Sequence, residues 1–324
     1  MSGHSNREKS DGVEVNRRSV LKCMSWAGAG VLWTVSAGVP RTLGLVGEAS
    51  AAEAATGALN FVQISDSHIG FKLPPNPDPA ETLGEAIAKI KAMPVEPTFL
   101  VHTGDISHLS KPEQWDIADQ VIKGANKPVH FIPGEHDVAD ADNGKLYLER
   151  YGKGTQGKGW YTFDAGGVHF VALINVFNFN PGFKSTGLAE LGNEQLEWLE
   201  KDLAHRSAST PIVVLAHLPL WTIYADWGWG TADAPRALGY LKRFGSVTVL
   251  NGHIHQIIQK VEGHITLHTA ASTAFPQPAP GAAPAPGPMA VPAGQLRKYL
   301  GLRDVDFVRG KAGAPALTET PLVA

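Results

Sequence analysis

Cysteine is almost absent from this chain: of 324 residues, only Cys23 carries a thiol. A single cysteine can form neither an internal disulfide framework nor a zinc site built from several thiolates. Any metal ion must therefore be held by imidazoles and carboxylates. The chain has these in quantity, with 13 His and 31 Asp or Glu.

An excess of positive charge is also lacking. The formal net charge is −3, and the first 51 residues hold 6 Lys or Arg and 4 Asp or Glu, which leaves 22 basic against 27 acidic residues in the remainder. This balance gives no support for a nucleic-acid or anionic-membrane partner. The apolar run Trp26 to Val39 has 14 residues, fewer than the ~20 that a membrane-spanning helix needs.

The N-terminal segment predicts export. Arg17 and Arg18 form a pair within residues 16–22, the apolar run follows, and Ala49-Ser50-Ala51 offers a cleavage site of small residues. These three regions in this order resemble a twin-arginine signal peptide. The resemblance implies residues 1–51 as a signal peptide, the twin-arginine export machinery as a partner, and a periplasmic or secreted product without a membrane span. An uncleaved amphipathic anchor is the alternative.

Residues 52–324 alternate between apolar strand-like runs and helical spacings, which predicts a single α/β domain. Asn193 is predicted to cap one helix, and the sequence from Ser110 to Glu113 has the form of a capping box for another. The Pro/Ala/Gly-rich segment 276–292 predicts no regular structure and forms either a surface loop or a lid. We expect strands at 59–65, 98–102, 129–132, 160–164, 168–175, 212–216, 247–250, 257–261 and 265–269, and helices at 82–93, 111–123, 193–203 and 234–244.

Several predicted strands end next to a side chain that binds metals. Loops at the carboxyl ends of strands converge in open α/β sheets, so these side chains are expected to meet. In Gly252-His253-Ile254-His255 two histidines can share a centre only if the backbone turns, and we expect Gly252 to permit that turn. Taken alone, this stretch also fits a surface loop. The strand-end residues are Asp66, Asp105, Glu135, His217 and His253.

Five short motifs in a fixed order carry a family resemblance. They are Asp66-X-His68, Gly104-Asp105, Gly134-X-His136-Asp137, His217 and Gly252-His253-X-His255. Together they resemble the calcineurin-like metallophosphoesterases over residues 59 to 269. The resemblance implies a four-layer αββα sandwich, in which two mixed β-sheets are flanked by helices.

The same resemblance implies a site for two divalent metal ions, Mn, Fe or Zn. One ion would be held by Asp66, His68 and His255, and the other by Glu135, His217 and His253, with Asp105 bridging both. A hydroxide between such ions attacks a phosphoester, and the ions clamp the phosphoryl oxygens. His136 would then donate a proton to the leaving group.

Two positions depart from the family pattern. Glu135 stands where Asn is usual, which adds a negative charge to one ion's ligands. His108 stands where some members carry an acidic residue that orients the catalytic histidine, so the orienting group is missing or supplied elsewhere. No tyrosine closely follows Asp105, so an iron–tyrosinate centre like that of purple acid phosphatases is not expected.

The substrate remains open. Trp221 and Tyr224, in the loop after His217, either pack against the body or form an aromatic wall that contacts a small-molecule phosphoester. Residues 137–142 are expected to be a solvated acidic loop. The motifs most resemble the cyclic-nucleotide phosphodiesterase-like branch, and a broader phosphodiester or phosphomonoester hydrolase is equally compatible. The alternatives are a nucleotidase or nucleotide-sugar hydrolase, and a non-catalytic metal-binding protein on the same scaffold.

Overall fold

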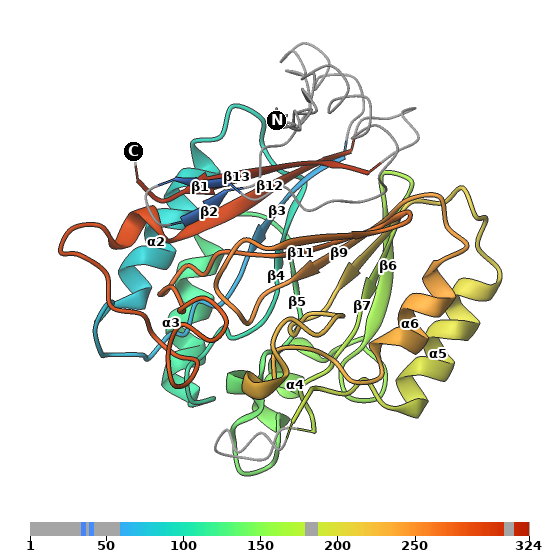
Figure 1. Cartoon of the computed structure of the whole chain (residues 1–324), viewed down its shortest axis with the longest axis horizontal. Coiled ribbons are helices and arrows are strands. Elements are labelled where there is room, and N and C mark those ends of the chain that lie inside the picture. The colour runs from blue at the N-terminus through green and yellow to red at the C-terminus, as the bar shows by residue number, and fades with distance from the viewer. Residues whose placement is uncertain (1–33, 37–38, 42–58, 179–186, 308–313, 324) are drawn as a thin grey trace, which may run out of the picture.

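The structure is a computed structural model that describes residues 34–36, 39–41, 59–178, 187–307 and 314–323. Its main body consists of two β-sheets packed face to face, with α2 and α3 on one side and α5 and α6 on the other (Figure 1). A short antiparallel hairpin, β1 (Thr34–Ser36) and β2 (Val39–Arg41), precedes them. The predicted four-layer αββα sandwich is therefore confirmed.

The first sheet has the strand order β13-β12-β3-β4-β5. The neighbours β3, β4 and β5 run parallel, whereas β12 is antiparallel to both β3 and β13. The parallel strands are short and largely apolar, so they can be covered on both faces. The strands are β3 (Leu59–Ile64), β4 (Phe99–His102), β5 (Val129–Phe131), β12 (Gly301–Phe307) and β13 (Ala316–Pro321).

The second sheet has the order β10-β11-β9-β8-β7-β6. Its centre, β11-β9-β8-β7, is parallel, and an antiparallel strand borders it on each side. The predicted hairpin after Trp160 is the pair β6–β7. The strands are β6 (Tyr161–Ala165), β7 (Val168–Ala172), β8 (Ile212–Leu215), β9 (Val247–Asn251), β10 (Gln259–Glu262) and β11 (Ile265–Thr269).

Three apolar cores hold the layers together. Between the sheets, Phe61 stacks on Phe99 and meets Phe170 edge-on, with ring centroids 5.1 and 5.3 Å apart. On the outer faces, each helix buries its apolar side against a sheet, as Leu83 does from α2 and Leu199 from α5. The helices are α2 (Pro79–Lys91), α3 (Pro112–Lys123), α4 (Lys145–Tyr151), α5 (Asn193–Ala204) and α6 (Ala234–Leu241).

Two predicted helix caps are wrong. The N-cap of α5 is Gly192, so Asn193 is the first helical residue, and the Asp233 carboxylate accepts the N–H of Gly192 (2.8 Å). The N-cap of α3 is Lys111, because the Ser110 hydroxyl instead donates to the Asp137 carbonyl (3.0 Å). In both places a tertiary hydrogen bond replaces the local one that the sequence pattern predicts.

Two elements of the fold were not expected from the sequence. The helix α4 and the strand β13 were not predicted, and segment 276–292 has no helix or strand, as predicted. Arg17, Arg18 and residues 49–51 lie outside the described residues, so the predicted signal peptide stays a prediction. Across the part of the chain that the structure describes, no helix is long and apolar enough to cross a membrane.

Candidate metal centre

The carboxyl ends of β3, β4 and β5 in one sheet and of β8 and β9 in the other come together. Since neighbouring parallel strands end at the same edge, the residues that follow them meet there. The backbone N–H of His68 donates to the Asp105 carbonyl (2.8 Å), and that of His253 donates to the Asp66 carboxylate (3.0 Å). The second of these bonds joins the two sheets across the edge.

A first cluster joins Asp66, His68, Asp105 and His255, all buried, with one candidate ligand atom from each within 4.8 Å of the others. Nε2 of His255 lies 3.3 Å from Oδ1 of Asp66 and 3.1 Å from Nε2 of His68. Nε2 of His68 lies 3.5 Å from Oδ2 of Asp105. These are the residues that the sequence assigned to one ion together with the bridging Asp105.

A second cluster joins Asp105, Glu135, His217 and His253 within the same 4.8 Å limit. Nε2 of His217 lies 2.9 Å from Oε2 of Glu135 and 3.4 Å from Oδ2 of Asp105, and Nδ1 of His253 lies 2.9 Å from Oε1 of Glu135. Oδ2 of Asp105 thus faces both clusters. Glu135, the residue that departs from the family pattern, points into the second cluster.

The unpaired atoms of these clusters fit cations. Oδ2 of Asp66, Oε2 of Glu135, Nε2 of His217 and Nδ1 of His253 are buried, and within the described chain none has a hydrogen-bond partner. Nε2 of His217 and Oε2 of Glu135 thus lie 2.9 Å apart without hydrogen-bond geometry. Buried polar atoms are nearly always satisfied, and a set of carboxylates and imidazoles suits Mn, Fe(II) or Zn. Two divalent ions, if bound, would satisfy these atoms.

Backbone carbonyls fix the orientation of two of the histidines. Nδ1 of His217 donates to the Thr103 carbonyl (2.6 Å), and Nδ1 of His255 donates to the Phe275 carbonyl (2.6 Å). Each bond places the hydrogen on Nδ1 and leaves Nε2 as the electron-pair donor that faces the cluster. Neither Thr103 nor Phe275 was singled out from the sequence, because a carbonyl acceptor leaves no signature in residue type.

The turns that carry these residues are strained. The φ angles of Asp66, His68, Asp105, His253 and His255 lie between 41° and 69°, where a residue with a side chain is destabilised by roughly 1–3 kcal/mol. The prediction that Gly252 supplies the turn is wrong, because the residues with positive φ are His253 and His255. The role of Gly252 is space, since a Cβ there would lie 2.2 Å from Oγ of Ser65.

The charges of the clusters act strongly on one another. Burial raises the pKa of Asp105 well above its usual range, and the negative charge of Glu135 raises it further. Burial opposes a charge on His217, yet Asp105 and Glu135 raise its pKa well above the ordinary value. Three carboxylates in one buried place thus draw positive charge, which is what divalent cations supply.

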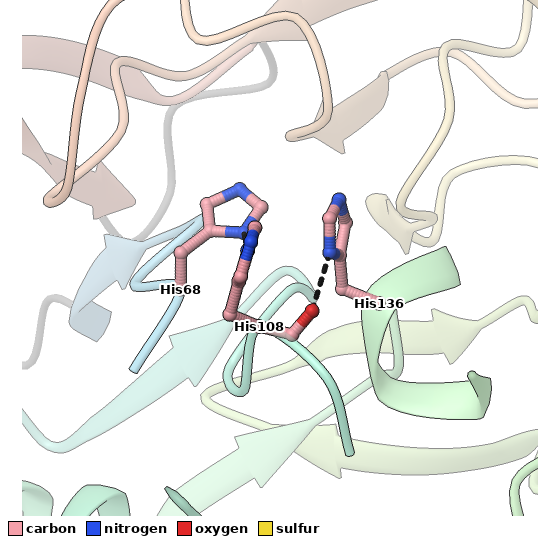
Figure 2. A group of neighbouring side chains, drawn as sticks. All are labelled: His68, His108 and His136. Atoms are coloured by element: carbon pink, nitrogen blue, oxygen red, sulfur yellow. Dashed lines mark hydrogen bonds between the residues drawn. The ribbon is translucent and has the colours of Figure 1, made fainter. Parts of the chain in front are cut away.

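His136 lies beside the clusters and is oriented by a backbone group (Figure 2). Its Nδ1 donates to the carbonyl of His108 (2.7 Å), and its backbone N–H donates to Oδ1 of Asp105 (3.0 Å). Its ring meets that of His68 edge-on, with centroids 4.6 Å apart. The orienting group that the sequence left open is therefore supplied by His108 itself, through its carbonyl instead of a carboxylate side chain.

The side chain of His108 contacts both histidines. Its Nδ1 lies 3.3 Å from Nδ1 of His68, and its ring stacks on that of His136 with centroids 4.8 Å apart. These residues form a third group of imidazoles, drawn in Figure 2, whose nitrogens lie within 4.8 Å of one another. His108 therefore contacts both His68 of the first cluster and His136, the residue that the family resemblance implies as the proton donor.

Asp137 is not part of a solvated loop, which corrects the prediction for residues 137–142. Its buried carboxylate accepts the backbone N–H groups of Ile106 (3.0 Å), Ser107 (2.8 Å) and Gly134 (3.0 Å). It thereby ties the loop that carries Asp105 to the loop that carries Glu135. Its place directly after Gly134-X-His136 was the signal that could have identified it.

The aromatic loop lies against the second histidine motif. Trp221 and Tyr224 are half-buried and pack on a small core of Trp229, Ile254 and Ile258, in which Ile254 separates the two ligand histidines. The structure therefore brings both predicted substrate-contacting residues next to the metal centre. Direct contact of Trp221 and Tyr224 with a substrate stays a prediction.

Comparison with known proteins identifies the family. The family model described as calcineurin-like phosphoesterase matches residues 59–257. The chain belongs to this family. It is thus a metallophosphoesterase, an enzyme that hydrolyses phosphoester bonds with two divalent metal ions. The enzyme class and the two-metal requirement that the resemblance implies are therefore confirmed.

Relatives of this metallophosphoesterase differ in activity. The chain is 27% identical over 223 residues to a probable glycerophosphodiester phosphodiesterase of Arcobacter nitrofigilis, covering 65% of this chain and 77% of that protein. It is 27% identical over 172 residues to a probable cyclic nucleotide phosphodiesterase of Rhodopseudomonas palustris, covering 50% and 57%. A dimetal phosphatase from Danio rerio shares the fold, with 15% identity, a TM-score of 0.57, and coverage of 82% of this chain and 96% of that one.

Proposed function

We propose that this metallophosphoesterase hydrolyses phosphodiesters in preference to phosphomonoesters. The observation that carries the proposal is a lack of cationic side chains: the segments that bear the site, 64–71, 102–110, 132–138, 215–221, 250–258 and 269–294, contain no Lys or Arg. A diester carries one negative charge at neutral pH, whereas a monoester carries up to two. With no cationic side chain in these segments to offset a second charge beside the ions, a diester is the better match.

The names of relatives support the same choice. Those from Arcobacter nitrofigilis and Rhodopseudomonas palustris are named as phosphodiesterases. The alternative of a non-catalytic protein drew on His108 and Glu135. It loses support because His136 is oriented by the carbonyl of His108 and Glu135 points into the second cluster.

The metal ions and His136 would have separate roles in the reaction. When bound, two divalent cations lower the pKa of a water molecule and offset the charge that develops on the phosphoryl oxygens. His136, held through its Nδ1 by the His108 carbonyl, can pass a proton from Nε2 to the departing alkoxide. Burial lowers the pKa of His136, with a partial offset from Glu135, which makes its protonated ring a stronger acid.

The test compares two esters with one chromophore. The purified protein is loaded with Mn(II), Fe(II) or Zn(II) and assayed with 4-nitrophenyl phosphate and with bis(4-nitrophenyl) phosphate. We expect kcat/KM for the diester to exceed that for the monoester by about 10-fold or more. A preference for the monoester would contradict the diester proposal. No turnover of either ester, with both clusters occupied, would contradict catalysis altogether.

We further propose that the protein is exported through the twin-arginine pathway to the periplasm or the medium. The support is the order of Arg17-Arg18, the apolar run to Val39 and the small residues at 49–51. Replacing both arginines by lysine should retain the protein in the cytoplasm with its N-terminus uncut. Export of this variant at the wild-type level would contradict the proposal, and cell fractionation with N-terminal sequencing checks it.

A further inference from the structure

The Pro/Ala/Gly-rich segment is fastened to the metal centre even though it contains no helix or strand. The buried side chain of Gln277 donates from Nε2 to the carbonyl of His253 (2.8 Å) and accepts the N–H of Gly287 at Oε1 (2.9 Å). The N–H of Met289 donates to the Pro276 carbonyl (2.8 Å). Residues 276–289 therefore form a closed loop, which we call the clasped loop, and Gln277 is its clasp.

Further bonds hold the clasped loop against the histidine motif. Nε2 of Gln256 donates to the carbonyls of Gln277 (3.1 Å) and Pro278 (2.6 Å). Just before the loop, the ring of Phe275 stacks on that of His68, with centroids 4.7 Å apart. Proline restricts φ, and the loop has prolines at 276, 278, 280, 284, 286 and 288. The loop is thus held in place with little conformational entropy left to lose on binding.

The clasped loop also reaches the aromatic loop, residues 221–229. A Cβ built on Gly281 would lie 3.4 Å from the hydroxyl oxygen of Tyr224, so backbone and phenol are neighbours. From Tyr224 a series of edge-to-face rings leads back to the metal centre: Tyr224 to Trp227 (5.2 Å), Trp227 to Trp229 (5.0 Å) and Trp229 to His253 (6.4 Å). The two loops form one continuous wall, and the buried ring of Trp229 connects it to His253 of the second cluster.

This wall carries almost no charge. Residues 263–295 include no Asp, Glu, Lys or Arg, and the aromatic loop contains only Asp226. An uncharged wall with exposed and half-exposed aromatic, proline and alanine surface gains free energy from contact with an apolar group. It gives no compensation for desolvating a second phosphate.

We propose that the clasped loop and the aromatic loop together receive the organic group of the substrate, and that this group is aromatic or apolar and carries no further phosphate. The proposal rests on the proposed phosphodiesterase function and names the substrate class for that site. Gln277 is a positioning residue in it, since it sets where the loop stands, and Tyr224 is the contacting residue. Diesters with an aromatic organic group are preferred, whereas nucleoside diphosphates and other pyrophosphates are poor substrates.

The test uses two diesters with the same leaving group and the same charge: bis(4-nitrophenyl) phosphate and methyl 4-nitrophenyl phosphate. In the wild-type enzyme we expect the aromatic diester to have the lower KM, by about fivefold, the size of one aromatic contact. Tyr224→Ala and Gln277→Ala should each reduce this ratio toward one, with both ions retained. Gln277→Glu keeps an acceptor for Gly287 but places a carboxylate oxygen against the His253 carbonyl, so it should lower the ratio at least as far as Gln277→Ala.

A control and a binding measurement separate the outcomes. Gln295→Ala, a glutamine beyond the clasped loop, should leave the ratio as in the wild type. Diphenyl phosphate should change the tryptophan fluorescence of the metal-loaded enzyme more than dimethyl phosphate does, and Tyr224→Ala should reduce that difference. Equal KM values for the two diesters in the wild type, or a loss in Gln277→Ala that is the same for both, would overturn the proposal. Absence of turnover of both diesters would instead refute the phosphodiesterase function.

Discussion

The two metal clusters are alike in composition and unlike in exposure. Each combines two carboxylates with two imidazoles, and Asp105 is common to both. In the first cluster every side chain is at most about 2% exposed, whereas Glu135 and His253 of the second are each 11% exposed. The first cluster is therefore enclosed by protein, whereas the second reaches solvent at Glu135 and His253.

Glu135 is what makes the two clusters equal in charge. With Asn at this position the second cluster would have one carboxylate against two in the first. With Glu135 each cluster has two carboxylates, so the clusters differ in exposure and not in the number of negative groups. An added anionic ligand strengthens cation binding and reduces the ion's power to attract phosphoryl oxygens.

The largest expected effect comes from removing the shared ligand. Asp105→Asn should lower the affinity for both ions together and reduce diester turnover by about 10³-fold or more, because several kcal/mol of charge stabilisation are lost. Metal content by mass spectrometry, measured beside activity, checks this. Asp66→Asn is the matched control, since it should lower occupancy of the first cluster only. Equal metal loss in both variants would mean that Asp105 is not shared.

Removing the proton donor should leave the clusters alone. His136→Ala is expected to lower kcat by about 10²–10⁴-fold, with metal content and KM close to those of the wild type. The deficit should be smaller for a diester whose leaving group is a good one, such as 4-nitrophenolate, than for a methyl ester. Uniform loss across leaving groups would assign His136 to the support of the ions.

Glu135→Asn breaks the equality of charge between the clusters. We expect affinity for the second ion to fall by about 10-fold or more, unchanged affinity for the first, and a higher turnover for each fully occupied molecule. Titration of the metal-free protein by calorimetry resolves the two binding steps. If neither step changes, the Glu135 carboxylate does not bind an ion.

Substitutions of His108 test whether its side chain strengthens metal binding at the first cluster. His108→Phe keeps the stacked ring and the backbone carbonyl but loses the nitrogen that faces Nδ1 of His68. We expect about 10-fold weaker binding of the first ion and little change in the leaving-group dependence that reports on His136. His108→Asn restores a side-chain acceptor and should recover part of the affinity. A change confined to the second ion would be the contrary result.

The smallest expected change concerns the free energy of unfolding in acid, measured without metal ions so that loss of ions does not contribute. Burial lowers the pKa of His268, which lies outside both clusters, to about 3, from about 6.5 in an unfolded chain. Between these values the unfolded chain binds more protons, so stability is complete above pH 6.5 and is lost as the pH falls toward 3. In chelator, His268→Asn should lose about 1 kcal/mol less free energy of unfolding than the wild type between pH 7 and 5.5 in urea unfolding. Parallel losses would show that other groups dominate.

The sequence predicted the strands, and the residues that come together at their ends, for one physical reason. A short apolar strand followed by Gly, Asp or His can be recognised locally, and parallel strand ends must share an edge, so Asp66, Asp105 and His217 were predictable. The supporting groups were not. The carbonyls of Thr103, His108 and Phe275 are backbone groups, which every residue has, so residue type does not reveal them. The predicted helix caps at Ser110 and Asn193 were wrong because tertiary hydrogen bonds, which local sequence does not show, replace the local ones.

Each cluster draws its residues from both sheets, so bound ions would have a second role in a protein nearly without cysteine. An ion in the first cluster would connect Asp66 and His68 to His255, and His68 and His255 lie 187 positions apart in the sequence. A covalent cross-link closing a loop of this length would stabilise the fold by roughly 5 kcal/mol through the entropy of the unfolded chain. A bound metal pair would thus act as a reversible counterpart of a disulfide, which chelators remove and reducing agents do not.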